Sequence, residues 1–284
     1  MRQISKEPMN SRIERLEAEA KNVRFHIVDM IYKAQSGHPG GAFSATDIVT
    51  ALYFDFMRVD PNNPSWEDRD RFVLSKGHAC PVQYACLALK GYFPIAELDT
   101  LRKFDSILQG HPVKQKTPGI DMTTGSLGHG LSIGVGMALE GKLSQKDFFT
   151  YVVIGDGELN EGQNWEAAAA AAKFSLHNLI AIIDRNRLQM DGFTDEIMPM
   201  GSINDKFRSF GWDVLEMDGH NMLDIVLTLE KARLTQRNKP ICIVAQTIKG
   251  KGVSFMENIR EWHGKAPNEQ EYKQAILEIK GTEA

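Results

Sequence analysis

Short apolar segments rich in Ile and Val recur along this chain, and longer segments with helical character separate them. The segments expected to form strands are 71–74, 151–154, 179–183, 214–217 and 240–246. Apolar runs without polar alternation are typical of strands buried on both faces, and their alternation with helices is typical of a parallel sheet. The sequence therefore predicts an α/β fold of three layers, in which a mostly parallel sheet lies between two layers of helices.

Helices are expected where apolar residues recur every three or four positions. The first is predicted from Ser11 to about Gln35, because Ser11 and Glu14 have the spacing of a capping box and apolar residues follow at helical spacing. Proline and paired glycines interrupt it at 36–41. Further helices are expected over 44–57, from the glycine-rich turn at 125–130 to Leu139, and over 164–174 with its six consecutive alanines.

The whole chain, residues 1–284, is expected to form one domain, because no repeat, low-complexity tract or linker interrupts it. The N-terminal helices, at about 1–60, are expected to form an arm, and residues from about 250 to 284 a C-terminal extension. A chain of this length can hold one large domain.

The overall charge of the chain is slightly negative, at -4. It gives no reason to expect nucleic acid or an anionic membrane as a partner. No apolar run approaches the roughly 20 residues of a membrane helix, and the polar N-terminus does not resemble a signal peptide. The three cysteines lack metal-binding spacing and are expected to be reduced, buried thiols of a cytoplasmic protein.

Two segments at predicted strand ends carry oxygen ligands. Segment 155–162 follows a buried strand, so that Asp156 projects from the strand end between two glycines that allow close approach of a ligand. After the next helix and strand, Asn186 offers an amide oxygen and Leu188 its main-chain carbonyl. With two diphosphate oxygens and a water, these groups complete the octahedral shell that Mg²⁺ requires. Gly-Asp-Gly alone is a common turn, but the two segments together predict a metal-bound diphosphate.

This pair of segments resembles the diphosphate motif of thiamine-dependent enzymes, although Arg185 stands where many members carry Asn or Asp. Other motifs, from 36–40 (Ser-Gly-His-Pro-Gly) to 262–267 (Trp-His-Gly-Lys-Ala-Pro), occur in the order found in transketolases. Nearly the whole chain thus resembles the N-terminal, diphosphate-binding domain of transketolase. The resemblance implies the thiamine diphosphate-binding fold, with thiamine diphosphate as cofactor and Mg²⁺ as its metal, for which Ca²⁺ or Mn²⁺ can substitute.

The resemblance also implies roles for individual residues. The implied metal ligands are Asp156, Asn186 and the carbonyl of Leu188. The implied cofactor-binding residues are His78, Gly125, Leu127, Asp156, Gly157, Asn186 and His263. The implied catalytic residues are His38, His111 and His263, which would line the substrate channel, and Glu161, which would join a carboxylate network at the subunit interface. Family members usually carry Pro at the position of Ser126 and Gln at that of His129, and neither departure removes a ligand.

Histidine suits a ketol transfer, because an imidazole can both take up and release hydroxyl protons near neutral pH. An isolated histidine in a loop is more often a surface residue, but the four with implied roles all lie in predicted turns at strand or helix ends. No role is expected for His26, His177 and His220. Segment 249–252 (Lys-Gly-Lys-Gly) is either a solvated turn or a basic loop beside the diphosphate, and the pattern fits both equally.

A complete transketolase has a second, pyrimidine-binding domain that carries the glutamate needed to activate the cofactor. The resemblance therefore implies that this chain is active only with a separate C-terminal, pyrimidine-domain subunit, in a heterotetramer of two copies of each. The expected reaction moves a two-carbon ketol unit between sugar phosphates. The alternatives are a split transketolase-like enzyme for a branched sugar or a sulfosugar, a deoxyxylulose phosphate synthase, a ketoacid dehydrogenase E1 subunit, and a non-catalytic cofactor-binding protein.

Overall fold

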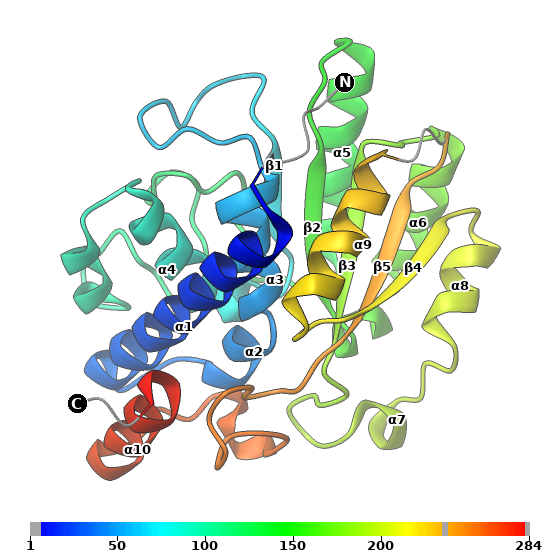
Figure 1. Ribbon diagram of the computed structural model, residues 1–284. Coiled ribbons are helices and arrows are strands. Elements are labelled where there is room, and N and C mark those ends of the chain that lie inside the picture. Colours follow the sequence, from blue (N-terminus) through cyan, green and yellow to red (C-terminus); the bar gives the residue numbers. More distant parts are fainter. Residues whose placement is uncertain (1–6, 235–237, 282–284) are drawn as a thin grey trace.

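The computed structural model describes residues 7–234 and 238–281, and the sheet within them has five strands (Figure 1). The strands are β1 (Arg71–Leu74), β2 (Thr150–Gly155), β3 (Leu179–Arg185), β4 (Asp213–Asp218) and β5 (Ile241–Gln246). Their order is β1-β2-β3-β5-β4, and every neighbouring pair is parallel. All five predicted strands and the parallel sheet are confirmed.

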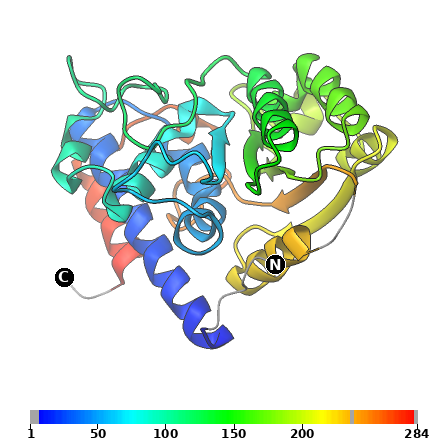
Figure 2. The same cartoon turned by 90° about the horizontal axis from the view of Figure 1, so that it is seen from above.

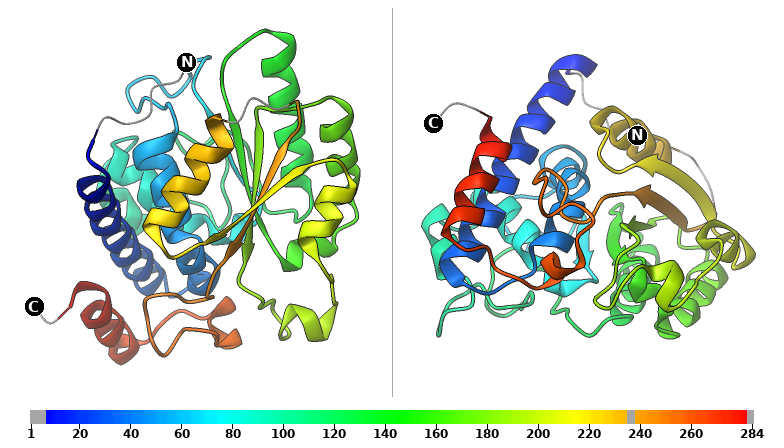
Figure 3. Two further views of the ribbon diagram at one scale, coloured as in Figure 1. Left: turned by 45° about the vertical axis from the view of Figure 1, so that its right-hand side comes forward. Right: turned by 90° about the horizontal axis from the view of Figure 1, so that it is seen from below.

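Two layers of helices cover the sheet. One layer contains α1 (Met9–Ala34), α3 (Thr46–Ala51), α4 (Cys80–Lys90) and α9 (Met222–Leu234), and the other contains α5 (His129–Leu143), α6 (Gln163–Lys173) and α8 (Ile203–Ser209). In β2, Tyr151 and Val153 are buried in the first layer's core, whereas Val152 and Ile154 are buried in the second's. Figure 3 shows the sheet between the two layers, so the predicted three-layer architecture is confirmed.

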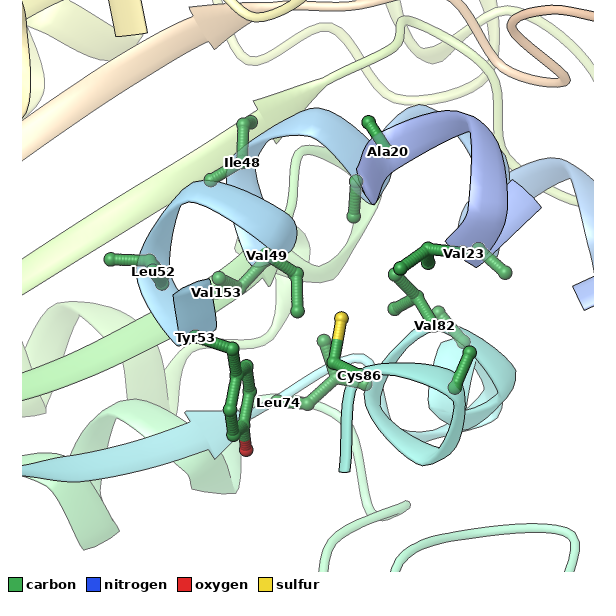
Figure 4. Close-up of a cluster of buried hydrophobic side chains, with 14 of the residues drawn as sticks. Ala20, Val23, Ile48, Val49, Leu52, Tyr53, Leu74, Val82, Cys86 and Val153 are labelled. Atoms are coloured by element: carbon green, nitrogen blue, oxygen red, sulfur yellow. The ribbon is translucent and has the colours of Figure 1, made fainter. Parts of the chain in front are cut away.

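The core on the first face is continuous from the strands into the N-terminal helices. Figure 4 shows Val23 of α1 facing Val82 and Cys86 of α4, with Val49 of α3 beside them. All three cysteines of the chain are free and buried. This packing fixes the N-terminal helices on the sheet, and with them the turns that reach the site described below.

The start of α1 differs from the prediction. The helix begins at Met9, its N-cap is Pro8, and no side chain caps it. The main-chain N–H of Arg12 donates to the Pro8 carbonyl at 3.0 Å. The capping box predicted at Ser11 and Glu14 is therefore wrong, because both residues already lie inside the helix.

The single helix predicted over 44–57 is also wrong. Instead, α2 (Pro39–Ser44) starts earlier, α3 follows it, and a π-helical turn covers Leu52–Phe56. Proline is favoured at the first position of a helix because its φ is already suitable. Pro39 thus starts a helix inside the predicted break, which leaves His38 as the N-cap of α2.

Several helices were not expected from the sequence, among them α4, α8, α9, the short α7 (Thr194–Ile197) and α10 (Glu269–Lys280). A capping box between Asn268 and Glu271 starts α10. Figures 2 and 3 show α10 lying along α1, where the rings of Tyr32 and Tyr272 stack at a centroid distance of 4.1 Å. None of the described helices is long and apolar enough to cross a membrane.

Candidate active site

A cavity of about 470 Å³ lies at the carboxyl ends of β2 and β3. Parallel pairing aligns Gly155 of β2 with Asp184 of β3, and Asp184 with Ala245 of β5, so these strands end at one edge of the sheet. Every residue with a role implied by the sequence lines this cavity, namely His38, His78, His111, Gly125, Leu127, Asp156, Gly157, Glu161, Asn186, Leu188 and His263.

Asp156 and Asn186 occupy the floor of the cavity and are almost fully buried, with exposed fractions of 4% and 6%. The Asp156 carboxylate accepts the main-chain N–H groups of Gly157, at 2.9 Å, and Arg187, at 2.7 Å. Burial, together with the nearby Asp184 charge, raises the pKa of Asp156 to about 6. A buried carboxylate held in this way gains stability from a cation placed against it.

Asp184, which the sequence analysis did not single out, fixes the orientation of the Asn186 amide. Its Oδ2 accepts the Asn186 Nδ2–H at 3.1 Å and the Ser44 hydroxyl at 2.6 Å. It also forms an ion pair with Lys76 and accepts the hydroxyl of Thr247. Burial alone would raise the pKa of Asp184, but the Lys76 charge outweighs it and lowers the pKa below its ordinary value. The amide oxygen of Asn186 is thereby left to face Leu188, whose N–H it accepts at 3.1 Å.

Lys249 is the main site residue that the sequence left undecided. Its Nζ donates to the Leu188 carbonyl at 2.7 Å and lies 2.8 Å from His263 Nδ1. The side chain is buried, and burial, reinforced by the Lys76 charge, lowers the pKa of Lys249 to about 8. The solvated-turn interpretation of 249–252 is therefore wrong for Lys249. Lys249 follows β5 at the same sheet edge where Asp156 follows β2. This placement in the sequence could have indicated that Lys249 belongs to the site.

Three histidines from separate segments form a cluster in the cavity. The ring centroids of His38 and His78 are 5.3 Å apart, those of His38 and His263 5.5 Å, and those of His78 and His263 5.1 Å. Burial, with nearby positive charge, lowers the pKa of His38 to about 4 and that of His263 to about 3. Burial also lowers the pKa of His78 and of His111. The cluster is thus neutral at pH 7, and its ring nitrogens can take part in hydrogen bonds as donors or acceptors.

The glycine-rich turn before α5 is held against β2 by Glu158. This buried carboxylate accepts the N–H groups of Gly128, at 2.9 Å, and Gly155, at 3.1 Å, and the Ser75 hydroxyl. The sequence predicts no role for Glu158, although Glu158 lies in the same segment, 155–162, as Asp156. Glu161 is exposed at the rim of the cavity.

Gly125 brings the same turn close to His111. Its φ of +139° is a conformation that side chains disfavour, and a Cβ there would lie 2.9 Å from the His111 ring. Only glycine fits this approach without displacing the imidazole.

The donor set fits a divalent cation that also binds phosphate oxygens. Among the described residues, no group of three or more His, Cys, Asp or Glu side chains is arranged to hold a metal by itself. One carboxylate, one amide oxygen and one main-chain carbonyl match the way Mg²⁺ binds, because this ion takes few protein ligands and several from phosphate and water. The cavity also contains two lysines, Lys76 and Lys249, that suit an anionic ligand.

Comparisons with known proteins agree with this geometry. Residues 16–281 match the family described as "Transketolase, thiamine diphosphate binding domain". The chain is 48% identical over 267 residues to one of the subunits of the apulose-4-phosphate transketolase of Phocaeicola vulgatus, and the match covers 94% of each protein. It is 47% identical over 264 residues to the 6-deoxy-6-sulfo-D-fructose transketolase subunit SqwG of Clostridium sp. strain MSTE9, covering 93% of this chain and 96% of that one.

The same fold occurs in a solved transketolase structure. The transketolase of Campylobacter jejuni superimposes with a TM-score of 0.88 and 33% identity, over 93% of this chain and 42% of that one. This chain therefore spans less than half the length of that transketolase but nearly the full length of the two subunits above. The chain belongs to the transketolase family and carries its thiamine diphosphate-binding domain.

Proposed function

We propose that this chain is the diphosphate-binding subunit of a two-subunit transketolase, which moves a two-carbon ketol unit between sugar phosphates. The observation that carries the proposal is the cavity at the sheet edge, where oxygen donors, two buried lysines and a neutral histidine cluster meet. A non-catalytic cofactor-binding protein would need the first two of these features but not His38 and His111, which have no proposed part in holding the cofactor.

The proposed metal is Mg²⁺, held by Asp156, Asn186 and the carbonyl of Leu188. That carbonyl also accepts a hydrogen bond from the Lys249 ammonium. Lys249, which lines the same cavity, would bind the diphosphate through its positive charge. His78 and the Gly157 amide would also bind the diphosphate, while Gly125 and Leu127 would contact the aminopyrimidine ring.

Thiamine diphosphate, when bound, supplies the carbanion chemistry that a ketol transfer needs. The chain's own contribution is to hold and move protons at the sugar hydroxyls. His38, His111 and His263 are the proposed residues, because they line the cavity and are neutral at pH 7, so that a ring nitrogen can accept a hydrogen bond from a sugar hydroxyl. A half-buried cluster also limits the access of water to the reacting atoms.

The partner is proposed to be a pyrimidine-domain subunit that covers the open side of the cavity, in a heterotetramer of two copies of each chain. Large apolar side chains are exposed at the cavity and in the segment that follows it, which favours a protein partner. Leu127 at 37% and Met190 at 66% line the cavity, and Phe193 at 47%, Ile197 at 46% and Met198 at 57% follow Met190 in the sequence. Glu161, at the same rim, would join the carboxylate network between the subunits.

We further propose that the whole chain forms one domain, with an N-terminal arm to about residue 60 and an extension from about residue 250, although residues 1–6, 235–237 and 282–284 lie outside the described part of the chain. The contact between α1 and α10 supports this, because it joins the two ends of the described chain. The protein is proposed to act in the cytoplasm.

Calorimetry with thiamine diphosphate and Mg²⁺ tests the cofactor site. Asp156→Ala should abolish the metal-dependent part of binding. The matched control is Asp195→Ala, because Asp195 is an exposed acidic residue of α7. Equal affinity of Asp156→Ala and the unchanged chain would disprove the ligand assignment.

A ketol-transfer assay with and without the partner subunit tests whether activity requires both subunits. The donors should include an apulose phosphate and a sulfofructose as well as ordinary ketose phosphates, because the two relatives above are named for those sugars. Activity is expected only with both subunits. Full activity of this chain alone would rule out the proposed split.

A further inference from the structure

His220, for which the sequence predicts no role, lies in the turn after β4 and forms a hydrogen bond at each ring nitrogen. Its Nδ1 is 2.8 Å from Asp47 Oδ2, and its Nε2 is 2.8 Å from the main-chain nitrogen of Ile248. The carboxylate can only accept a proton, and the main-chain N–H can only donate one. These two partners therefore place the single proton of a neutral imidazole on Nδ1, with Nε2 as the acceptor.

Asp47, on α3, is itself fixed by Arg24 of α1. The two side chains form a bidentate pair with N–O distances of 2.8 and 2.6 Å, and both are buried. Burial alone would raise the pKa of Asp47, but Arg24 and His220 outweigh it and bring the pKa to about 2. The carboxylate is thus ionised at any working pH and gives His220 a rigid anchor on the helical layer.

The main-chain N–H that His220 accepts belongs to Ile248, in the segment that also places Lys249 in the cofactor cavity. Segment 247–252 is irregular, and Ile248 is the residue directly before Lys249. Other contacts hold its flanks: the Gly250 N–H donates to the Gly40 carbonyl at 3.0 Å, and Arg24 donates to the Lys251 carbonyl at 3.1 Å. The Arg24–Asp47–His220 chain therefore reaches this segment at two points, on both sides of Lys249.

The direction in which a side chain leaves the main chain depends on the orientation of the adjoining peptides. The N–H that His220 holds belongs to the peptide that ends at Ile248, so it fixes the backbone one residue before Lys249. His220 does not line the cofactor cavity, whereas Lys249 does. Any effect of His220 on cofactor binding is consequently indirect, and its hydrogen bond to Ile248 links it to the segment that carries Lys249.

We propose that His220 is a positioning residue, which Asp47 and Arg24 orient so that it fixes the main chain at Ile248 and directs Lys249 into the cofactor cavity. The proposal rests on the role given above to Lys249 in binding the diphosphate. His220 touches neither cofactor nor substrate.

Amide hydrogen exchange in the full, cofactor-free chain tests the first part, because it needs no ligand. His220→Asn keeps a donor for Asp47 but loses the acceptor for Ile248, and His220→Gln can place an oxygen where Nε2 was. The Ile248 amide should exchange at least ten-fold faster in His220→Asn and in His220→Ala, and at close to the original rate in His220→Gln. His177→Ala, which removes an exposed histidine, is the control. Unchanged exchange at Ile248 in His220→Asn and His220→Ala would overturn the proposal.

A double-mutant cycle tests the second part, with calorimetry of thiamine diphosphate and Mg²⁺ as the readout. His220→Asn should weaken binding about ten-fold in the original chain and have almost no effect when Lys249 is already replaced by Met, because coupled residues are not additive. The same loss in both backgrounds would mean that His220 acts independently of Lys249, and the proposal would be wrong. Failure of the unchanged chain to bind the cofactor would count against the proposed function instead, and the exchange experiment would still decide whether His220 fixes the segment.

Discussion

The buried ammonium of Lys249 should make the cofactor-free chain less stable than a variant without it. Burial and the Lys76 charge lower the pKa of Lys249 from its ordinary value of 10.5 to about 8. The folded chain thus binds this proton more weakly than the unfolded chain does. The penalty is absent above pH 10.5, grows as the pH falls, and is complete below pH 8. One pKa unit corresponds to about 1.4 kcal/mol, so the full penalty is about 3 kcal/mol.

Lys249→Met removes the charge but keeps an unbranched side chain of similar length. The change also leaves the Leu188 carbonyl without the Lys249 donor, which costs about 1 kcal/mol. The net expectation is a gain in the free energy of unfolding of about 2 kcal/mol at pH 7. At pH 10 the remaining penalty is only about 1 kcal/mol, so the gain should disappear.

Urea unfolding at pH 7 and pH 10, in the presence of a chelator and without cofactor, measures this difference. Lys251→Met is the matched control: Lys251 is half-buried and pairs with Glu257 at 3.4 Å, so its loss should change stability by less than about 0.5 kcal/mol. Calorimetry should show that Lys249→Met has lost most of its affinity for thiamine diphosphate. A variant that is less stable at pH 7, or whose gain is the same at pH 10, would refute the reasoning.

Other substitutions give similarly distinct outcomes. Gly125→Ala should lower the free energy of unfolding by about 1–3 kcal/mol, because its Cβ would press on the His111 ring from a strained backbone; a melting-temperature scan would show it. Gly136→Ala, in α5 with open space around the new Cβ, should instead stabilise the chain by about 0.5–1 kcal/mol in the same scan. Asp184→Asn should cost about 3–5 kcal/mol in denaturant unfolding, because it leaves the buried Lys76 charge unpaired. A melting temperature of Asp184→Asn within a degree of the original would contradict the last of these.

The strands were predictable because their signal is local. Runs such as 151–154 and 179–183 are apolar throughout, and only a strand buried on both faces needs that composition. Helix ends were less predictable, since more than one local pattern can mark the start of a helix. In α1 the helix begins after Pro8 and not at the capping pattern of Ser11, and in α2 it begins at Pro39. The C-terminal α10 was missed although its capping box at Asn268 and Glu271 was a local signal.

For the site, the sequence identified residues that belong to recognisable motifs and missed those that act through distant partners. The resemblance to transketolase predicts Asp156, Asn186 and the four histidines as site residues, and the structure brings them into one cavity. Nothing local distinguishes Asp184 or His220, whose importance comes from Lys76 and Asp47, more than a hundred positions away along the chain. Lys249 is an intermediate case, because its place after a buried strand was visible but its burial was not.

The parallel order of the sheet has a consequence for how the protein reaches its native state. Parallel neighbours cannot be joined by a hairpin, and here β1 ends at Leu74 while its partner β2 begins only at Thr150. Contacts so distant in the chain form slowly, because closing a long loop costs conformational entropy before the contacts can stabilise it. The cavity draws on segments that follow β1, β2, β3 and β5, so it cannot exist until all four have assembled. Thiamine diphosphate binding during refolding would consequently report the assembly of these four strands rather than early collapse, whether or not the edge strand β4 has joined.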